Sequence, residues 1–400
     1  MIFTFEALQA DKGDCLILHY GSNNDPKIIV IDGGPGNIYR NSLKPRLLQI
    51  REGLAPDSSL PLSMVMVSHM DDDHVNGILD LVDDLQDAMD DNESPDFDIQ
   101  HMWFNTFDDI VGNLQFPVVS GLARTATVAD LVTAVPQYAR LDHHLSAVIA
   151  STGQGRHLRD TADRLTITVN HPFTPMGDGN VSLVRNGILQ EAIDWGDDLT
   201  IQVLHPDQER LLEMQKKWDD DLKAAAERGD DSIIFASLGQ KDKSPFNLAS
   251  IVCLVEFGGK RILLTGDARD DDVLEGLRRA DILDDNDHVH VDILKIPHHG
   301  SERNMSRNFF EHVTADHYVI SGNGEHHNPD KATLVMLSEA TRGRENFDVH
   351  FTNHEGKFDL KDKLDEFIED ERNHGRTYGI MFRDDPALSL TINLLDEIDY

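Results

Sequence analysis

The sequence has little cysteine, few basic residues and no long apolar run. Its 400 residues include only Cys15 and Cys253, which argues against a disulfide framework and favours the reducing cytoplasm. No run of about 18 apolar residues is present, so we expect no membrane span. The N-terminal stretch "MIFTFEALQADKGDC" has no basic segment followed by a long apolar one, so we expect no signal peptide either.

Basic residues are outnumbered by acidic ones. Lys and Arg total 36 against 72 Asp and Glu, which gives a formal net charge of -36. Such a surface repels polyanions, which disfavours broad nucleic-acid binding without excluding a local basic groove. Histidine, by contrast, is frequent: the chain has 20, and several of them cluster.

The chain alternates between strand and helix patterns. Short apolar runs predict strands, whereas Val75, Ile78, Leu79, Val82, Leu85 and Met89 recur at helical spacing. A hairpin is expected to turn at Gly258 and Gly259, and residues 107–195 read as a helical or irregular insertion. The expected strands include 2–8, 15–20, 27–32, 63–68, 99–105, 199–207 and 291–297, and the expected helices 40–52, 207–228, 271–280 and 331–340.

The stretch "SHMDDDHVNG" at residues 68–77 joins a predicted strand to a predicted helix. Ligands often bind at the carboxyl ends of strands, and imidazoles with carboxylates suit zinc, manganese or iron. We expect His69 and Asp71 to face one cation and Asp73 and His74 a second, with Asp72 pointing away. The alternative is that Asp73 only caps the helix, but a helix cap leaves the two histidines unexplained. Asp72→Asn should therefore have only a mild effect on activity, whereas Asp73→Asn should abolish activity.

Other ligand-type residues also follow predicted strands. Asp267 ends "RILLTGD", where a carboxylate could bridge two metals, although a turn aspartate has the same pattern. His298 and His299 follow "ILKIP", and a surface histidine pair is the alternative there. His205, after "TIQVL", is the best-placed candidate for a third ligand of the first metal, although a histidine at a strand end is usually structural. The loop "SGNGEHHNP" carries His326 and His327, whose imidazoles and backbone N–H groups could hold an anionic oxygen.

Taken together, these motifs resemble the H-x-H-x-D-H signature of the metallo-β-lactamase superfamily, with Asp71 in place of the second histidine. More narrowly, the chain is similar to the hydrolase domain of the DNA-uptake channel protein ComEC and its stand-alone relatives. The segments that carry this resemblance are "DKGDCLIL" with Gly13 and Asp14, "IDGG" with Asp32, "SHMDDDHVNG", "NLASIVCLVEFGGKRILLTGD", "LKIPHHGS" and "GEHHNP". The subgroup's "GHP" is "HHNP" here, so either His326 or His327 could match its histidine. The membrane helices of the channel protein have no counterpart.

The resemblance implies a fold and a metal centre. The fold would be a four-layer αββα sandwich, formed by residues 1–400 as a single domain with the insertion at about 107–195. Two divalent ions, zinc or manganese, would hold a bridging hydroxide, and Asp71 favours manganese because it makes the first site more anionic. The metal ligands would be His69, Asp71, Asp73, His74, His205, Asp267, and His298 or His299. Asp73 and His327 would take part in the reaction, while Asp32 and Ser301 would support the ligands without binding metal.

The resemblance favours a phosphodiesterase or nuclease over other hydrolases. The basic residues nearest the motifs are Lys295, Arg303, Arg307 and Lys331, a stripe too thin for a long duplex, so a small anionic phosphodiester fits better. One alternative is hydrolysis of a small ester, lactone or amide on the same centre. The other is a non-catalytic, metal-binding regulatory subunit that docks a protein partner through residues 107–195.

Overall fold

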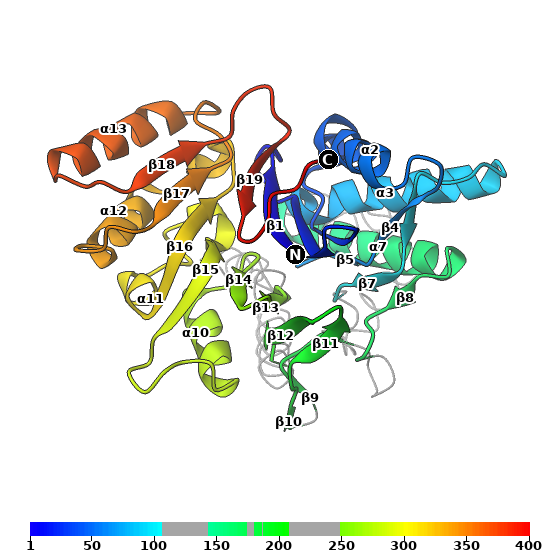
Figure 1. Ribbon diagram of the computed structural model, residues 1–400, viewed down its shortest axis with the longest axis horizontal. Coiled ribbons are helices and arrows are strands. Elements are labelled where there is room, and N and C mark those ends of the chain that lie inside the picture. Colours follow the sequence, from blue (N-terminus) through cyan, green and yellow to red (C-terminus); the bar gives the residue numbers. More distant parts are fainter. Residues whose placement is uncertain (106–142, 174–179, 186, 208–248) are drawn as a thin grey trace, which may run out of the picture.

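The computed structural model is built on two large mixed β-sheets (Figure 1). It describes residues 1–105, 143–173, 180–185, 187–207 and 249–400. The first sheet has seven strands, in which antiparallel pairs join β19, β1, β2 and β3, and parallel pairs continue from β3 to β8. In spatial order these strands are β19 (Ser389–Asn393), β1 (Ile2–Leu8), β2 (Leu16–Ser22), β3 (Asp25–Ile31), β5 (Met64–Met66), β7 (His101–Trp103) and β8 (Thr168–Val169).

The second sheet has eight strands and follows a similar plan. Antiparallel pairs run from β11 to β14, and parallel pairs run from β14 to β18. Its strands are β11 (Ile193–Gly196), β12 (Leu199–His205), β13 (Val252–Phe257), β14 (Lys260–Leu264), β15 (Val289–Lys295), β16 (Val313–Ile320), β17 (Asp348–Phe351) and β18 (Gly379–Phe382). Two small sheets pair β4 (Leu60–Leu62) with β6 (Phe97–Ile99) and β9 (Val184–Arg185) with β10 (Ile188–Leu189).

Helices follow most of the parallel strands. A short helix and a π-helical turn lead into α2, and α3 begins directly after the acid-rich loop that follows β5. The helices are α1 (Gly36–Ile38), the π-helical turn (Tyr39–Leu43), α2 (Lys44–Leu54), α3 (Asp72–Asp90), α7 (His143–Arg164), α10 (Asp270–Arg279), α11 (Arg307–His312), α12 (Lys331–Ala340) and α13 (Leu360–Asn373).

Three apolar clusters define the layers of an α/β sandwich. One cluster lies between the two sheets, and Phe3, Phe5 and Ala7 of β1 contribute to it at the two-residue period of a strand. A second cluster packs the first sheet against α2, α3 and α7, and a third packs the second sheet against α10, α11, α12 and α13. Each sheet therefore buries one face against the other sheet and the opposite face against helices.

Most of the elements expected from the sequence are confirmed, with ends shifted by a few residues. The apolar stripe of α3 is buried at Val75, Ile78, Val82 and Leu85, whereas Met89 is exposed. The hairpin at Gly258 and Gly259 joins β13 to β14. Within the interval 107–195, β8 and β11 add edge strands to the two sheets. The helix expected at 207–228 lies outside the described residues, apart from Asp207.

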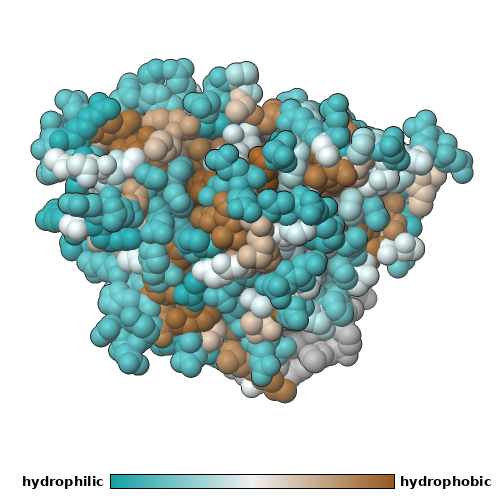
Figure 2. Space-filling view, in the orientation of Figure 1, coloured by the Kyte–Doolittle hydropathy of each residue, from teal (hydrophilic) through white to brown (hydrophobic). Residues whose placement is uncertain are grey.

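Three other expectations concern cysteines, membrane helices and the surface. Cys15 and Cys253 are both free and buried, as the absence of a disulfide framework requires. None of the helices in the described ranges combines the length and apolar character needed to cross a membrane. Hydrophilic residues cover much of the face shown in Figure 2, with apolar residues in smaller areas between them.

Candidate metal centre

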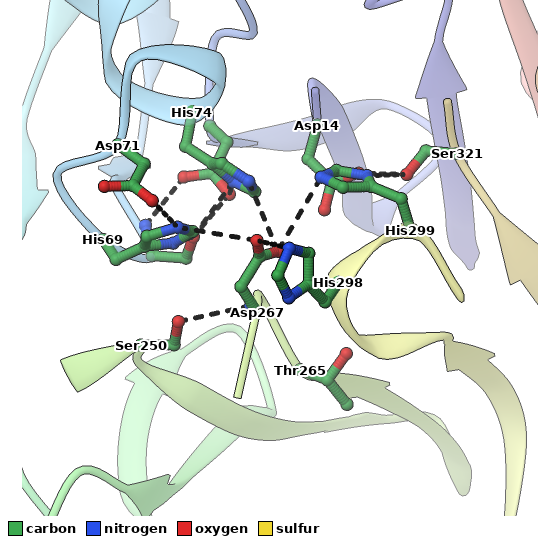
Figure 3. Close-up of polar contacts among 12 residues, drawn as sticks. Asp14, His69, Asp71, His74, Ser250, Thr265, Asp267, His298, His299 and Ser321 are labelled. Atoms are coloured by element: carbon green, nitrogen blue, oxygen red, sulfur yellow. Dashed lines mark hydrogen bonds and ion pairs between the residues drawn. The ribbon is translucent and has the colours of Figure 1, made fainter. Parts of the chain in front are cut away.

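Asp267 lies at the centre of a buried group of histidines (Figure 3). Its Oδ1 is 3.3 Å from Nε2 of His74 and 3.8 Å from Nε2 of His299. Its Oδ2 is 3.5 Å from Nε2 of His298 and 3.8 Å from Nε2 of His69. The two oxygens of one carboxylate therefore face two different pairs of imidazoles.

These side chains come from the carboxyl ends of strands in both sheets. His69 and His74 follow β5 of the first sheet, Asp267 follows β14, and His298 and His299 follow β15. Gly266 allows the two sheets to approach here: its φ is +50°, and a Cβ on it would lie 3.1 Å from the Cβ of Ser68. The site thus lies at the end of the sandwich where strands of both sheets terminate.

The histidines of the first sheet are oriented by Asp32 and Ser68. Nδ1 of His74 lies 2.9 Å from Asp32, and Nδ1 of His69 lies 3.0 Å from Oγ of Ser68. The hydroxyl and the backbone N–H of Ser68 both donate to Asp32, each at 2.7 Å. With Nδ1 engaged on each ring, Nε2 is the atom turned towards Asp267, an arrangement common in metal-binding histidines.

The histidines of the second sheet are oriented in the same way. Nδ1 of His298 lies 3.0 Å from Oδ1 of Asn304, and Nδ1 of His299 lies 3.1 Å from Oγ of Ser321. Both backbones adopt positive φ, 47° and 52°, which bulky residues rarely do outside functional sites. Asn304 also donates from Nδ2 to the carbonyl of Asp267 at 3.1 Å, so it positions two members of the group.

Asp14 is a further member of the group that the sequence motifs contained without a role. It is 1% exposed, lies 3.5 Å from Nδ1 of His299, and accepts a hydrogen bond from the hydroxyl of Ser321. Nζ of Lys295 approaches its other oxygen at 2.9 Å. Asp14, His74, Asp267 and His299 each offer a ligand atom, and these four atoms all lie within 4.8 Å of one another.

The position of Lys295 differs from the one expected from the sequence. The sequence placed it in a basic stripe near the site, but the structure buries it to 1% exposure against Asp14. Its charge is therefore neutralised inside the protein and contributes little to an anion-binding surface. Lys295 ends β15, and the last three residues of this strand are all buried.

The donor atoms at the centre fit a metal ion. Nε2 of His69, His74 and His299 and Oδ1 of Asp267 are buried and have no hydrogen-bond partner among the described residues. Leaving such an atom unsatisfied costs about 1–3 kcal/mol, and here four of them converge. Imidazole nitrogens and carboxylate oxygens are the ligands that zinc and manganese take. The buried group of Asp14, His74, Asp267 and His299 could therefore bind a metal ion.

The close packing of carboxylates and imidazoles shifts the pKa values of the group in both directions. Desolvation, with the charges of Asp73 and Asp267, raises the pKa of Asp71 to about 8. Desolvation opposes the charged form of His74, but Asp267 and Asp32 outweigh it and raise its pKa well above its usual range. Desolvation and the neighbouring His74 lower the pKa of His69 to about 4, which leaves this ring neutral and able to act as a ligand.

The three consecutive aspartates occupy different surroundings. An oxygen of Asp71 lies 3.7 Å from Nε2 of His69. Asp72 is exposed and accepts a hydrogen bond from Nε2 of Gln154 at 2.7 Å, so it points away from the group as expected. Asp73 is half-buried, and its carbonyl accepts the N–H of Asp14 at 3.3 Å. Its carboxylate is not one of the four grouped ligands, so its role as a ligand stays a prediction.

The structure leaves three other predicted residues outside the buried group. His205 ends β12 with 3% exposure and pairs with Val252, but it is not one of the four grouped ligands. The side chain of His327 is 60% exposed; its ring packs on Phe358 with centroids 4.4 Å apart. His326 is also exposed. Neither His205 nor His327 is among the four grouped ligands, so their roles at the centre stay predictions.

Ser301 lies beside the group through its backbone. It is buried at 5% exposure, and its N–H donates to the carbonyl of His298 at 2.9 Å. This bond closes the tight Pro297–Gly300 turn that presents both histidines. Ser301 can therefore support the ligands through the turn.

Comparison with known proteins adds no further information about the site. No model of a protein family matches the chain, and no curated protein matches it either.

Proposed function

We propose that the protein is a metal-dependent hydrolase that cleaves phosphodiesters, with the fold of the metallo-β-lactamase superfamily and similarity to the ComEC hydrolase domain. The observation that carries the proposal is the convergence of four buried ligand atoms that form no hydrogen bond, contributed by His69, His74, His299 and Asp267. A structural role alone gives no reason to bury so many polar atoms without hydrogen bonds.

The arrangement of the sheets supports the proposed fold. Each sheet begins with antiparallel strands and continues with parallel ones, and helices pack on the outer faces. The motifs that resemble the superfamily's signature lie at strand ends, where its metal ligands would be expected. The four-layer αββα assignment is part of this proposal.

Two metal ions are proposed, divided by the two oxygens of Asp267. His74 and His299, on the Oδ1 side with Asp14, would hold one ion; His69 and His298, on the Oδ2 side, would hold the other. The pairing of Asp73 with His74 expected from the sequence is not part of this division, and Asp73 as a ligand stays a prediction. Carboxylates from Asp14 and Asp71 make the site hard and anionic, which favours manganese over zinc.

The chain's own residues would bind and orient the reacting groups. When bound, divalent ions in such a site lower the pKa of water and stabilise negative charge on phosphoryl oxygens. Asp32, Ser68, Asn304 and Ser321 hold the imidazoles in the tautomer and direction that present Nε2. The side chains of His298 and Asp71 are 23% and 28% exposed, so substrate would approach from their side of the group.

A small phosphodiester suits the charge distribution better than a long polymer. The net charge is -36, and Lys295 is buried. Arg307 pairs with Glu311 and Glu339, and Lys331 pairs with Glu366, so acidic partners offset much of the expected basic stripe. A long duplex needs many unpaired cations along its path, whereas a short substrate needs few.

Parallel hydrolysis assays test this function. Protein purified without chelators is analysed for bound metal and then given a chromogenic phosphodiester or a lactone, each with added Mn²⁺ or Zn²⁺. We expect phosphodiester cleavage that requires metal. Cleavage of only the lactone would establish the ester or amide alternative, and bound metal without hydrolysis of either substrate would favour a regulatory subunit.

A further inference from the structure

A second group of ligand-type side chains lies on strands β16 and β17 of the eight-stranded sheet. It consists of His317, Asp348 and His350, and each offers one ligand atom within 4.8 Å of the others. None of them belongs to the group around Asp267. The sequence motifs gave no indication of this second site.

Strand pairing brings the three residues together. His317 of β16 is the register partner of Asp348 in the parallel strand β17. His350 is two residues beyond Asp348, so both side chains project from the same face of the sheet. Val349 and Phe351, on the other face, pack in the core beneath the helices. The regular register of the sheet therefore fixes the arrangement without a loop.

The distances and exposures suit a cation reached from solvent. Nδ1 of His317 lies 3.0 Å from Nε2 of His350 and 3.8 Å from Oδ2 of Asp348. His350 is 7% exposed, whereas the side chains of His317 and Asp348 are 25% and 34% exposed. One ligand is thus anchored in the interior, and the other two leave open positions that water can fill.

Asp348 is held in position by a separate contact. Its Oδ1 accepts the N–H of Gly379 from the next strand at 3.0 Å, which leaves Oδ2 on the side of the histidines. A Cβ at position 379 would come within 2.3 Å of Oδ1, so a side chain there would displace the carboxylate from this contact. Such an outer hydrogen bond is typical of carboxylates that ligate metals.

A simple hydrogen bond between the two rings is the competing explanation. It accounts for the 3.0 Å contact but not for the position of Oδ2 of Asp348, which faces the rings at 3.8 Å from Nδ1 of His317, too far for a hydrogen bond. If each ring carries its proton on its other nitrogen, Nδ1 of His317 and Nε2 of His350 both present a lone pair to one ion.

We propose that Nδ1 of His317, Nε2 of His350 and Oδ2 of Asp348 bind a divalent transition-metal ion of the zinc class, with water completing the coordination. Two imidazoles and one carboxylate are a ligand set that zinc and copper accept. The ion would link β16 to β17 and stabilise this part of the sheet. This site does not depend on the activity proposed for the Asp267 centre.

Metal counting on matched variants tests the proposal. Chelator-stripped protein is titrated with Zn²⁺, and bound zinc is measured by calorimetry and elemental analysis for the wild type, His317→Ala and Asp348→Asn. The control is His290→Ala, a neighbouring surface histidine whose ring lies 3.0 Å from Oγ1 of Thr314 and 3.3 Å from Oδ1 of Asp316. We expect the control to match the wild type and both test variants to lose one bound zinc or to bind it at least roughly tenfold more weakly.

Repeating the titration in the Asp267→Asn background separates the two sites. In this background, Cu²⁺ bound at the second site should give an electron paramagnetic resonance spectrum with nitrogen couplings from two imidazoles, and His317→Ala should remove them. The proposal is overturned if His317→Ala and Asp348→Asn bind as much zinc, as tightly, as the wild type. If the Asp267 centre binds no metal, the wild type should still bind more zinc than His317→Ala and Asp348→Asn.

Discussion

At the scale of single residues, Asp267 is a buried carboxylate surrounded by histidines (Figure 3). It is 3% exposed and is approached by four imidazole Nε2 atoms. Desolvation alone would raise its pKa, but the surrounding histidines, His298 first, lower it well below its usual range. A neutral amide at this position would lose both the charge and one of the two oxygens.

Asp267→Asn is therefore expected to remove most of the metal bound at the centre and to lower activity at least about 100-fold. Asp72→Asn, which removes a carboxylate from the same loop system but at an exposed position, should retain metal and activity within about twofold. Elemental analysis and initial rates measure both effects. Equal losses in the two variants would show that the buried group is not the metal centre.

The sequence revealed some of these residues better than others. Asp267, His69, His74, His298 and His299 stand directly after apolar strands, a pattern readable from one sequence, and the structure brings them together. The contribution of Asp14 was not readable, because its partners Lys295 and Ser321 lie on distant strands of the other sheet. A residue whose role depends on a contact between sheets leaves no periodic signal in the chain.

At the scale of elements, the site depends on direct contact between helix α3 and the loop after β3. Gly33 donates its N–H to the carbonyl of His74 at 2.7 Å, and Gly77 donates to Gly34 at 3.0 Å. A Cβ on Gly77 would come within 2.0 Å of the carbonyl oxygen of Gly33. The helix can approach Asp32 closely enough to orient His74 only because no side chain intervenes.

Gly77→Ala should force α3 away from this loop. We expect lower stability together with metal affinity reduced by roughly tenfold or more, because His74 would lose its alignment with Asp32. Gly153→Ala, in helix α7 with open space around its Cβ position, is the control. It should raise stability by about 0.5–1 kcal/mol and leave metal binding unchanged. Thermal unfolding and metal titration would contradict this if Gly77→Ala behaved like the control.

Glu6 connects three elements, because this residue of β1 contacts side chains of β2 and α2. Oε1 of Glu6 accepts hydrogen bonds from Nη2 of Arg46 and pairs with Nε2 of His19, both at 2.7 Å. Desolvation opposes the charged form, but His19 and Arg46 outweigh it and lower the pKa of Glu6 from 4.5 to about 2. The stabilising effect is therefore complete above pH 4.5 and is lost as the pH falls through 2.

Acid unfolding should report this contribution. Between pH 4.5 and pH 2, Glu6 is expected to account for about 3 kcal/mol of the fall in the free energy of unfolding. Glu6→Gln should be less stable at neutral pH and should show a flatter dependence across that window. Glu52→Gln, at an exposed position of α2, should follow the wild-type curve. Parallel curves for wild type and Glu6→Gln would contradict the assignment.

Element prediction succeeded where the chain has strong periodicity. The stripe of α3 and the hairpin between β13 and β14 follow directly from spacing and turn residues. The edge strands β8 and β11 were not recognised because two to four residues are too few to establish a period. Their place in the sheets depends on partners that the local sequence does not specify.

At the scale of the whole molecule, the candidate metal centre joins the two sheets. His69, His74 and Asp14 belong to the side of the first sheet, whereas Asp267 and His299 follow strands of the second. An ion bound by both sets would cross-link the sandwich at the end where Lys295 already pairs with Asp14. The strand and helix rhythm predicted an α/β sandwich, but which strand ends face one another depends on packing.

Metal removal should therefore lower the stability of the whole molecule. At a free metal concentration 100 times the Kd, binding contributes about 2.7 kcal/mol, which a chelator would abolish. Urea unfolding with and without the chelator measures this difference. Asp267→Asn should lose the greater part of the chelator effect. A wild type unaffected by chelation would contradict metal binding between the sheets.

The pairing of β1 with β19 has a consequence for the order of folding. The first sheet places Thr4 opposite Asn393 and Leu8 opposite Ser389, so β1, second from the edge of the sheet, pairs with the last strand described. During synthesis, β1 leaves the ribosome long before its partner exists. Until then its outer backbone groups form an open sheet edge, a surface on which chains aggregate. Nascent chains stalled before residue 389 should therefore depend on chaperones more than chains released after residue 393.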